Sequence, residues 1–140
     1  MNLLNDMSII LKNFFYFLFF CILLYTSQLS AQSNECAKFK NGIFNLIDKK
    51  TGTSYIKRYG NRQSEITDGK KDSTTYVVKW LDDCTYTLTP TQETFKVYPF
   101  LPLDALLTVT IIKTKKNSYI QTSSANFSDK KVTSEIIKIE

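Results

Sequence analysis

The chain has 140 residues, 43% of them hydrophobic, with a formal net charge of +5 and no histidine. This length allows one domain and no more. Because histidine is the commonest general base and metal ligand, its absence excludes Ser–His–Asp and Cys–His catalysis and weakens the case for a metal site. We therefore expect a protein that is not an enzyme and that holds no cofactor.

The N-terminal segment has the order of a secretory signal peptide. Lys12 precedes an uncharged apolar run at residues 14–25, and Ala31 offers a small residue for cleavage. A positive charge, an apolar run and a small-residue exit, in that order, are typical of signal peptides. We predict a signal-peptide helix within residues 1–31, cut after Ala31.

Two alternatives to this cleavage stay open. A cut after Ser33 would place small residues at both recognition positions, Ala31 and Ser33. A retained membrane anchor is the other alternative, although a spanning helix needs about 20 apolar residues and the run is shorter than that. In the main interpretation the mature protein is one domain over residues 32–140, and it touches a membrane only through an uncleaved signal segment.

The cysteines agree with export. Of the three, Cys21 lies within the predicted signal peptide, which leaves Cys36 and Cys84 as one pair in the mature chain. In an oxidising compartment such a pair is expected to form a disulfide. The alternative is two buried thiols. In the chain-entropy model a loop of this size contributes roughly 4 kcal/mol of stability.

From Gly42 onward, apolar and polar residues alternate with the period of a β-strand, and this predicts about eight short strands. We expect them at residues 43–47, 54–59, 63–67, 75–80, 84–89, 106–114, 118–122 and 132–139. The short connections favour an all-β antiparallel meander, curled into a lipocalin-like barrel. A sandwich is the alternative. The polar strand at 63–67 is expected at an edge of the sheet.

One apolar connection breaks the alternation, at residues 97–103. Pro99 and Pro102 exclude a regular central strand there. Its apolar side chains cover one end of the core or form a lip over a ligand pocket. The candidate ligand-loop residues are Tyr98, Phe100, Leu101 and Leu103.

The sequence does not favour two other kinds of site. Asp68 and Asp72 flank two lysines that would repel a cation, so we expect no metal site. Aromatic and basic side chains interleave as in a nucleic-acid platform, but lysines are spread over every loop, and we expect a solvated surface and no nucleic-acid partner. The interleaved residues are Tyr55, Lys57, Arg58, Tyr59 and Arg62.

Two motifs carry a resemblance to a known group. The sequences CAKFKNGIF at residues 36–44 and KWLDDCTYTL at residues 79–88 resemble a group of small exported proteins of Bacteroidetes bacteria. The resemblance implies an envelope or extracellular location, a β fold and a Cys36–Cys84 bridge, and no activity. Some members are labelled as topoisomerase subunits, but this chain has no nucleotide-binding motif that would support such a role.

Together these features predict an exported β protein, periplasmic or extracellular, acting as a non-catalytic binding or structural module of the cell envelope or secretome. The alternative is a lipocalin-like carrier of a small apolar ligand, since a barrel of about eight strands can hold one small molecule. The partner would accordingly be a small apolar ligand or an envelope protein.

Overall fold

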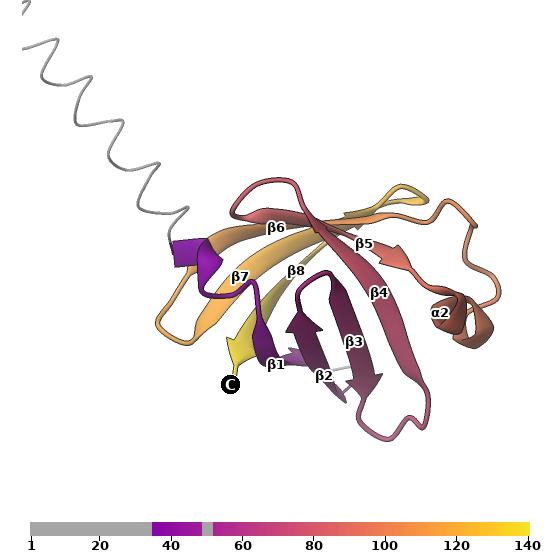
Figure 1. Cartoon of the computed structure of the whole chain (residues 1–140), viewed down its shortest axis with the longest axis horizontal. Coiled ribbons are helices and arrows are strands. Elements are labelled where there is room, and N and C mark those ends of the chain that lie inside the picture. The colour runs from indigo at the N-terminus through magenta and orange to yellow at the C-terminus, as the bar shows by residue number, and fades with distance from the viewer. Residues whose placement is uncertain (1–34, 49–51) are drawn as a thin grey trace, which may run out of the picture. The chain divides into compact units, whose positions relative to one another are not determined.

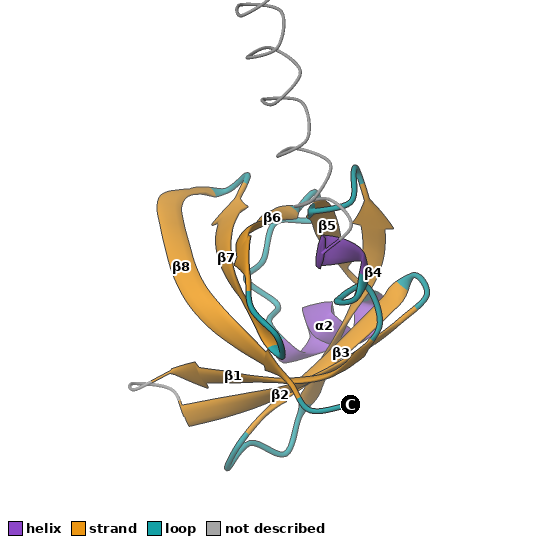
Figure 2. Cartoon of the chain, turned by 90° about the vertical axis from the view of Figure 1, so that its left-hand side faces the viewer, coloured by secondary structure: helices purple, strands orange, loops and turns teal. Residues whose placement is uncertain are grey.

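Eight antiparallel strands follow one another along the chain and close into a barrel (Figures 1 and 2). The computed structural model describes residues 35–48 and 52–140, and the predicted signal peptide lies outside the described residues. The strands are β1 (Gly42–Asp48), β2 (Gly52–Tyr59), β3 (Arg62–Thr67), β4 (Ser73–Trp80), β5 (Thr85–Pro90), β6 (Leu107–Thr114), β7 (Ser118–Ala125) and β8 (Ser128–Lys138). The predicted antiparallel meander is confirmed.

Pairing between the first and last strands closes the barrel. Phe44 of β1 lies opposite Lys138 of β8, and β1 pairs along its other side with β2. This closure favours the barrel over the sandwich. It also shows that the expectation of an edge strand at residues 63–67 was wrong, because β3 pairs with both β2 and β4. A closed barrel has no edges, so a polar strand needs no edge position when its inward side chains find polar partners.

Strand alternation divides the side chains between the interior and the solvent. Val78 is 4% exposed, whereas its neighbour Val77 is 43% exposed. In β6, Ile111 is buried and Ile112 is exposed. Trp80 is half-buried and packs against the core, as the alternation in its strand predicts. A shift of one residue in register would turn these apolar groups to solvent, so the pattern fixes the pairing.

One end of the barrel is filled by an apolar plug. A helical turn at residues 35–37 leads into it, and Cys36 and Phe39 are both fully buried. They pack with Phe44, Ile56, Ile111, Tyr119 and Ile136. Cys36 is bonded to Cys84, and the two Cα atoms lie 5.2 Å apart. The predicted disulfide is therefore confirmed, and it ties the plug to the turn between β4 and β5.

Gly42 lets the chain pass closely over its C-terminal residues. Its φ is +142°, and a Cβ atom there would lie 2.3 Å from the carbonyl oxygen of Glu140. Ile43 donates its backbone N–H to that same oxygen at 2.8 Å. A side chain at position 42 would thus break the contact that joins the start of β1 to the residues after β8.

A short helix, α2 (Gln92–Val97), follows β5, and it was not predicted because no helical periodicity marks these residues. Six residues make less than two turns, so no apolar stripe can develop. The helix is held by Thr94, which is fully buried and accepts a hydrogen bond from the backbone N–H of Thr75 at 2.8 Å. α2 begins the connection between β5 and β6.

Candidate functional site

A buried arginine lies at the centre of the barrel interior. Arg58 of β2 is 1% exposed and follows the inward-facing Ile56 by two positions. A buried charge is costly unless hydrogen bonds compensate it. Its three nitrogens all donate within the protein, to Gln63 Oε1 (2.5 Å), the Phe39 carbonyl (3.2 Å), and the hydroxyls of Tyr86 (2.7 Å) and Tyr119 (3.2 Å).

The ring faces around Arg58 add to this compensation. Its guanidinium carbon lies 4.4 Å from the ring centroid of Tyr86 and 5.2 Å from that of Phe44. Cation–π contacts of this length stabilise a desolvated guanidinium. Burial lowers the pKa of Arg58, but the interactions with Tyr86 and Tyr119 outweigh it and raise that pKa, so Arg58 stays charged.

Two hydrogen-bonded arms extend from Arg58 across the interior. In the first, Gln63 accepts from Arg58 and its amide nitrogen donates to Glu65 Oε1 at 2.6 Å. Burial raises the pKa of Glu65, against the opposing effects of the Gln63 amide and the Arg58 charge. The pKa of Tyr76 is also raised, to about 12, by burial and then by the Glu65 charge. Gln63 thus separates Arg58 from Glu65.

The second arm runs through a tyrosine. Tyr86 accepts from Arg58 Nη2 and its hydroxyl donates to Gln121 Oε1 at 3.2 Å. Burial raises the pKa of Tyr86 well above its ordinary value, so this side chain stays a neutral phenol with one proton to donate. Its ring packs at 4.6 Å, centroid to centroid, against Trp80. Tyr86 and Gln121 are both buried, which makes this arm part of the barrel's interior.

A cavity of about 410 Å³ adjoins these arms. Its polar lining includes Arg58, Gln63, Glu65 and Gln121, and its apolar lining includes Leu46, Ile56, Leu88, Leu107 and Val109; Ser123 and Ser134 contribute small side chains. Leu88 and Leu107 stand near the end of β5 and the start of β6. The cavity therefore extends from Arg58 away from the plugged end.

The predicted ligand loop lies at that same end of the barrel, because it joins β5 to β6. Phe100 is 78% and Leu103 91% exposed, so neither fills the core. Tyr98 and Leu101 are half-buried, and the rings of Tyr98 and Phe100 meet edge to face at 5.7 Å. None of these four residues is among those that line the cavity. Their role in holding a ligand stays a prediction.

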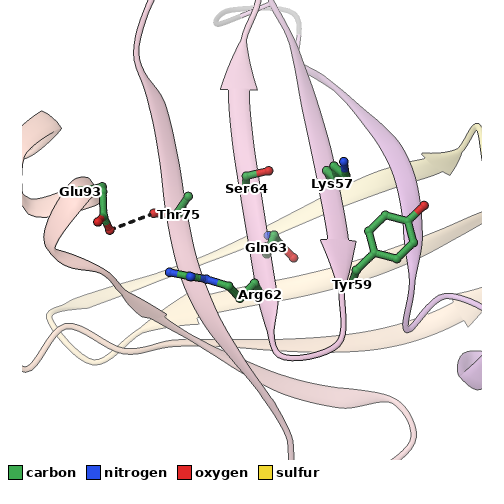
Figure 3. Close-up of a pocket in the computed structure, with 7 residues that line it drawn as sticks. All are labelled: Lys57, Tyr59, Arg62, Gln63, Ser64, Thr75 and Glu93. Carbon is green, nitrogen blue, oxygen red and sulfur yellow. Dashed lines mark hydrogen bonds between the residues drawn. The ribbon is translucent and has the colours of Figure 1, made fainter.

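A second hollow, of about 430 Å³, lies outside the barrel on β2, β3 and β4 beside α2 (Figure 3). It is lined by Lys57, Tyr59, Arg62, Gln63, Ser64, Thr75 and Glu93. Glu93 accepts a hydrogen bond from Thr75 at 3.5 Å. Arg58 does not belong to this surface, so one member of the basic and aromatic set seen in the sequence has turned inward.

The Arg58 network was not predicted as a site from the sequence. The one available signal was position: Arg58 shares a strand face with Ile56, and Glu65 shares one with Gln63. Charged residues on an inward face are rare unless they are paired or functional. This position can be used for prediction only when the inward face of each strand is known.

Among residues 35–48 and 52–140, no group of three or more metal-ligating side chains occurs. None of the helices in this part of the chain is both long enough and apolar enough to span a bilayer.

No protein-family model, no curated protein and no solved structure matches this chain.

Proposed function

We propose that this protein is a non-catalytic carrier that binds one small amphiphilic molecule inside its barrel. The observation that carries the proposal is the cavity of about 410 Å³ beside the Arg58 network. Ligand pockets typically measure about 300–1,000 Å³ and combine apolar walls with a few fixed polar groups. The cavity has both, since leucine and valine side chains form its walls and Glu65 and Gln121 stand at its polar end.

The distribution of side chains supports a binding chamber over a purely structural core. An eight-stranded barrel is just wide enough for side chains to fill it or to leave room for one small ligand. At the plugged end, large side chains such as Phe39, Phe44 and Tyr119 fill the interior. Toward the other end, Ser123 and Ser134 take inward positions, and these short side chains leave the space open.

The carrier is proposed to act after export, in the periplasm or outside the cell. The signal-peptide order of residues 1–31 supports this, and so does the Cys36–Cys84 disulfide, because disulfides persist in oxidising compartments. The mass of the protein recovered after export tests it. We expect a chain that begins at Gln32 and lacks the two thiol hydrogens, and a chain that retains residues 1–31 would contradict cleavage.

A steric block tests the carrier proposal. N-phenyl-1-naphthylamine, a neutral apolar reporter that fluoresces in apolar surroundings, should bind the protein and brighten. Ser123→Phe places a ring in the cavity and should abolish this signal. Ser124→Phe is the matched control, because position 124 adjoins Ser123 on β7 but does not line the cavity, and it should leave binding intact.

Two results would contradict the carrier. One is an absence of reporter binding to the unaltered protein. The other is binding that Ser123→Phe leaves unchanged, which would place the reporter outside the barrel, for example in the outer hollow of Figure 3.

A further inference from the structure

Arg58 sets the direction of every hydrogen bond in the two arms. A guanidinium only donates, so the oxygen of Gln63 must accept from it and the Gln63 amide nitrogen must face Glu65. Glu65 Oε1 is thereby fixed as an acceptor. The first arm ends on the carboxyl group of Glu65, whose other oxygen, Oε2, has no hydrogen-bond partner among the residues that the structure describes. Burial raises the pKa of this group, but the Gln63 hydrogen bond and the Arg58 charge favour its ionised form, in which Oε2 accepts as well.

The second arm ends on a donor instead of an acceptor. Tyr86 accepts from Arg58, so its single proton goes to the oxygen of Gln121. The amide nitrogen of Gln121 then carries two N–H donors, for which the described residues provide no acceptor. Both Glu65 and Gln121 line the cavity. The cavity thus offers an acceptor from the first arm and donors from the second.

We propose that the cavity selects a small amphiphile whose polar end is a neutral carboxamide, with its N–H directed to Glu65 and its carbonyl accepting from Gln121. This inference rests on the proposed carrier function. A carboxamide carries both a donor and an acceptor and no charge, which are the groups that the two endings require. Its apolar part would lie against Leu88, Leu107 and Val109.

Arg58 does not make the chamber a carboxylate site, although a buried arginine invites that interpretation. Four of its five N–H groups already donate to oxygens of the protein, so at most one remains for a ligand and the two-bond pairing that a carboxylate makes with arginine is not available. A carboxylate has only acceptors, so it would leave Glu65 Oε2 facing another anion. An ammonium group would satisfy Glu65, but it would leave the Gln121 donors unmatched and would share the chamber with the charge of Arg58.

Three probes of equal chain length test this selectivity on the oxidised protein. Octanamide, octanoate and octylamine compete with N-phenyl-1-naphthylamine for the barrel at pH 7, and displacement gives each affinity. We expect octanamide to bind at least tenfold more tightly than octanoate and more tightly than octylamine. This comparison needs no variant, so it holds even where a substitution in the network prevents folding.

Two near-isosteric variants should shift the preference in opposite directions. In Glu65→Gln, the new amide oxygen must accept from Gln63, so the amide nitrogen presents donors to the cavity. The affinity for octanoate should therefore rise relative to that for octanamide. In Gln121→Glu, the new carboxylate accepts from Tyr86 and presents a second acceptor to the cavity. The affinity for octylamine should therefore rise relative to that for octanamide. A thermal melt of each variant shows that it is folded before its affinities are compared.

The outcomes separate the two proposals. If the reporter binds but octanoate or octylamine binds as tightly as octanamide, the carboxamide inference is wrong and the carrier stands. If both variants fold and keep the preference of the unaltered protein, the assignment of Glu65 and Gln121 is wrong. If the reporter does not bind the unaltered protein, the carrier proposal itself fails.

Discussion

The Nη2 atom of Arg58 lies 2.7 Å from the hydroxyl oxygen of Tyr86, and the guanidinium carbon lies 4.4 Å from the centroid of the same ring. One tyrosine thus provides both an acceptor and an aromatic contact for a buried cation. These two residues are 28 positions apart, on β2 and β5. Their contact crosses the barrel interior, so the site forms only when the barrel has folded.

Removal of the Tyr86 hydroxyl should destabilise the fold. Tyr86→Phe leaves a donor of Arg58 without this acceptor and the oxygen of Gln121 without its donor. Leaving buried polar groups unsatisfied costs about 1–3 kcal/mol. Urea unfolding measures the loss. Tyr119→Phe is the matched comparison: its hydroxyl accepts from Arg58 at 3.2 Å, so the loss should be smaller. An equal or larger loss of stability in Tyr119→Phe would contradict the prediction that the Tyr86 hydroxyl contributes more.

The disulfide should supply a large share of the stability. Cys36 and Cys84 are 48 positions apart, and a bridge over such a loop contributes roughly 4 kcal/mol in the chain-entropy model. The double variant Cys36→Ser/Cys84→Ser should unfold at a much lower urea concentration. Dithiothreitol should lower the midpoint of the unaltered protein and leave that of the variant unchanged. A midpoint of the unaltered protein that does not respond to reduction would contradict the structural role.

Glu65 should make the protein less stable as pH rises. Burial raises its pKa in the folded state above the value of about 4.3 for an unfolded chain. Between those two values the folded state binds more protons than the unfolded state, so the free energy of unfolding falls as pH rises through this window. Its favourable contribution is complete only below the unfolded pKa. Glu65→Gln should remove this decline, as urea midpoints from pH 4 to 8 would show.

A glutamate at the surface provides a control of opposite sign. Hydrogen bonds from Lys115 and Ser118 lower the pKa of Glu135, so its contribution is present above the unfolded pKa and is lost as pH falls. Glu135→Gln should therefore reduce the loss of stability in acid and leave the decline that Glu65 causes. If both variants change the pH profile alike, the assignment to Glu65 is wrong.

The loop after α2 should affect the ligand more than the fold. Phe100 is 78% exposed, so Phe100→Ala should change the free energy of unfolding by no more than about 0.5 kcal/mol. If the loop is a lip, the bound reporter should dissociate severalfold faster from this variant. Leu81→Ala, at an exposed residue after β4 and near the plugged end, is the control and should leave the dissociation rate unchanged. Equal dissociation rates of the reporter from both variants would contradict the interpretation of the loop as a lip over the ligand.

The barrel could be predicted from the sequence because its signals are local. Alternation in β4 and β6 placed Val78 and Ile111 inside without reference to any other strand, and the pairing of Cys36 with Cys84 followed from elimination. The six-residue α2 was missed because it is too short to show a periodicity. Closure of β1 on β8 was open as well, since no local feature separates a curled sheet from a sandwich.

The site could not be predicted because it depends on long-range pairing. Arg58 and Lys57 are adjacent basic residues, and only the register of β2 turns one inward and the other outward. Tyr119 is 61 positions from Arg58, and the barrel alone brings them together. The expected ligand residues were chosen for their apolar character. The polar groups that line the cavity, Glu65 and Gln121, lie in strands that looked like ordinary polar sequence.

The most direct test of a binding site inside the barrel is a nuclear magnetic resonance titration of the ¹⁵N-labelled protein with octanamide. We predict that the side-chain amide signals of Gln121 and Gln63 shift together, along with backbone signals of cavity-lining residues such as Val109. Shifts confined to the outer hollow around Lys57, Arg62 and Glu93, or no shifts at all, would contradict the account.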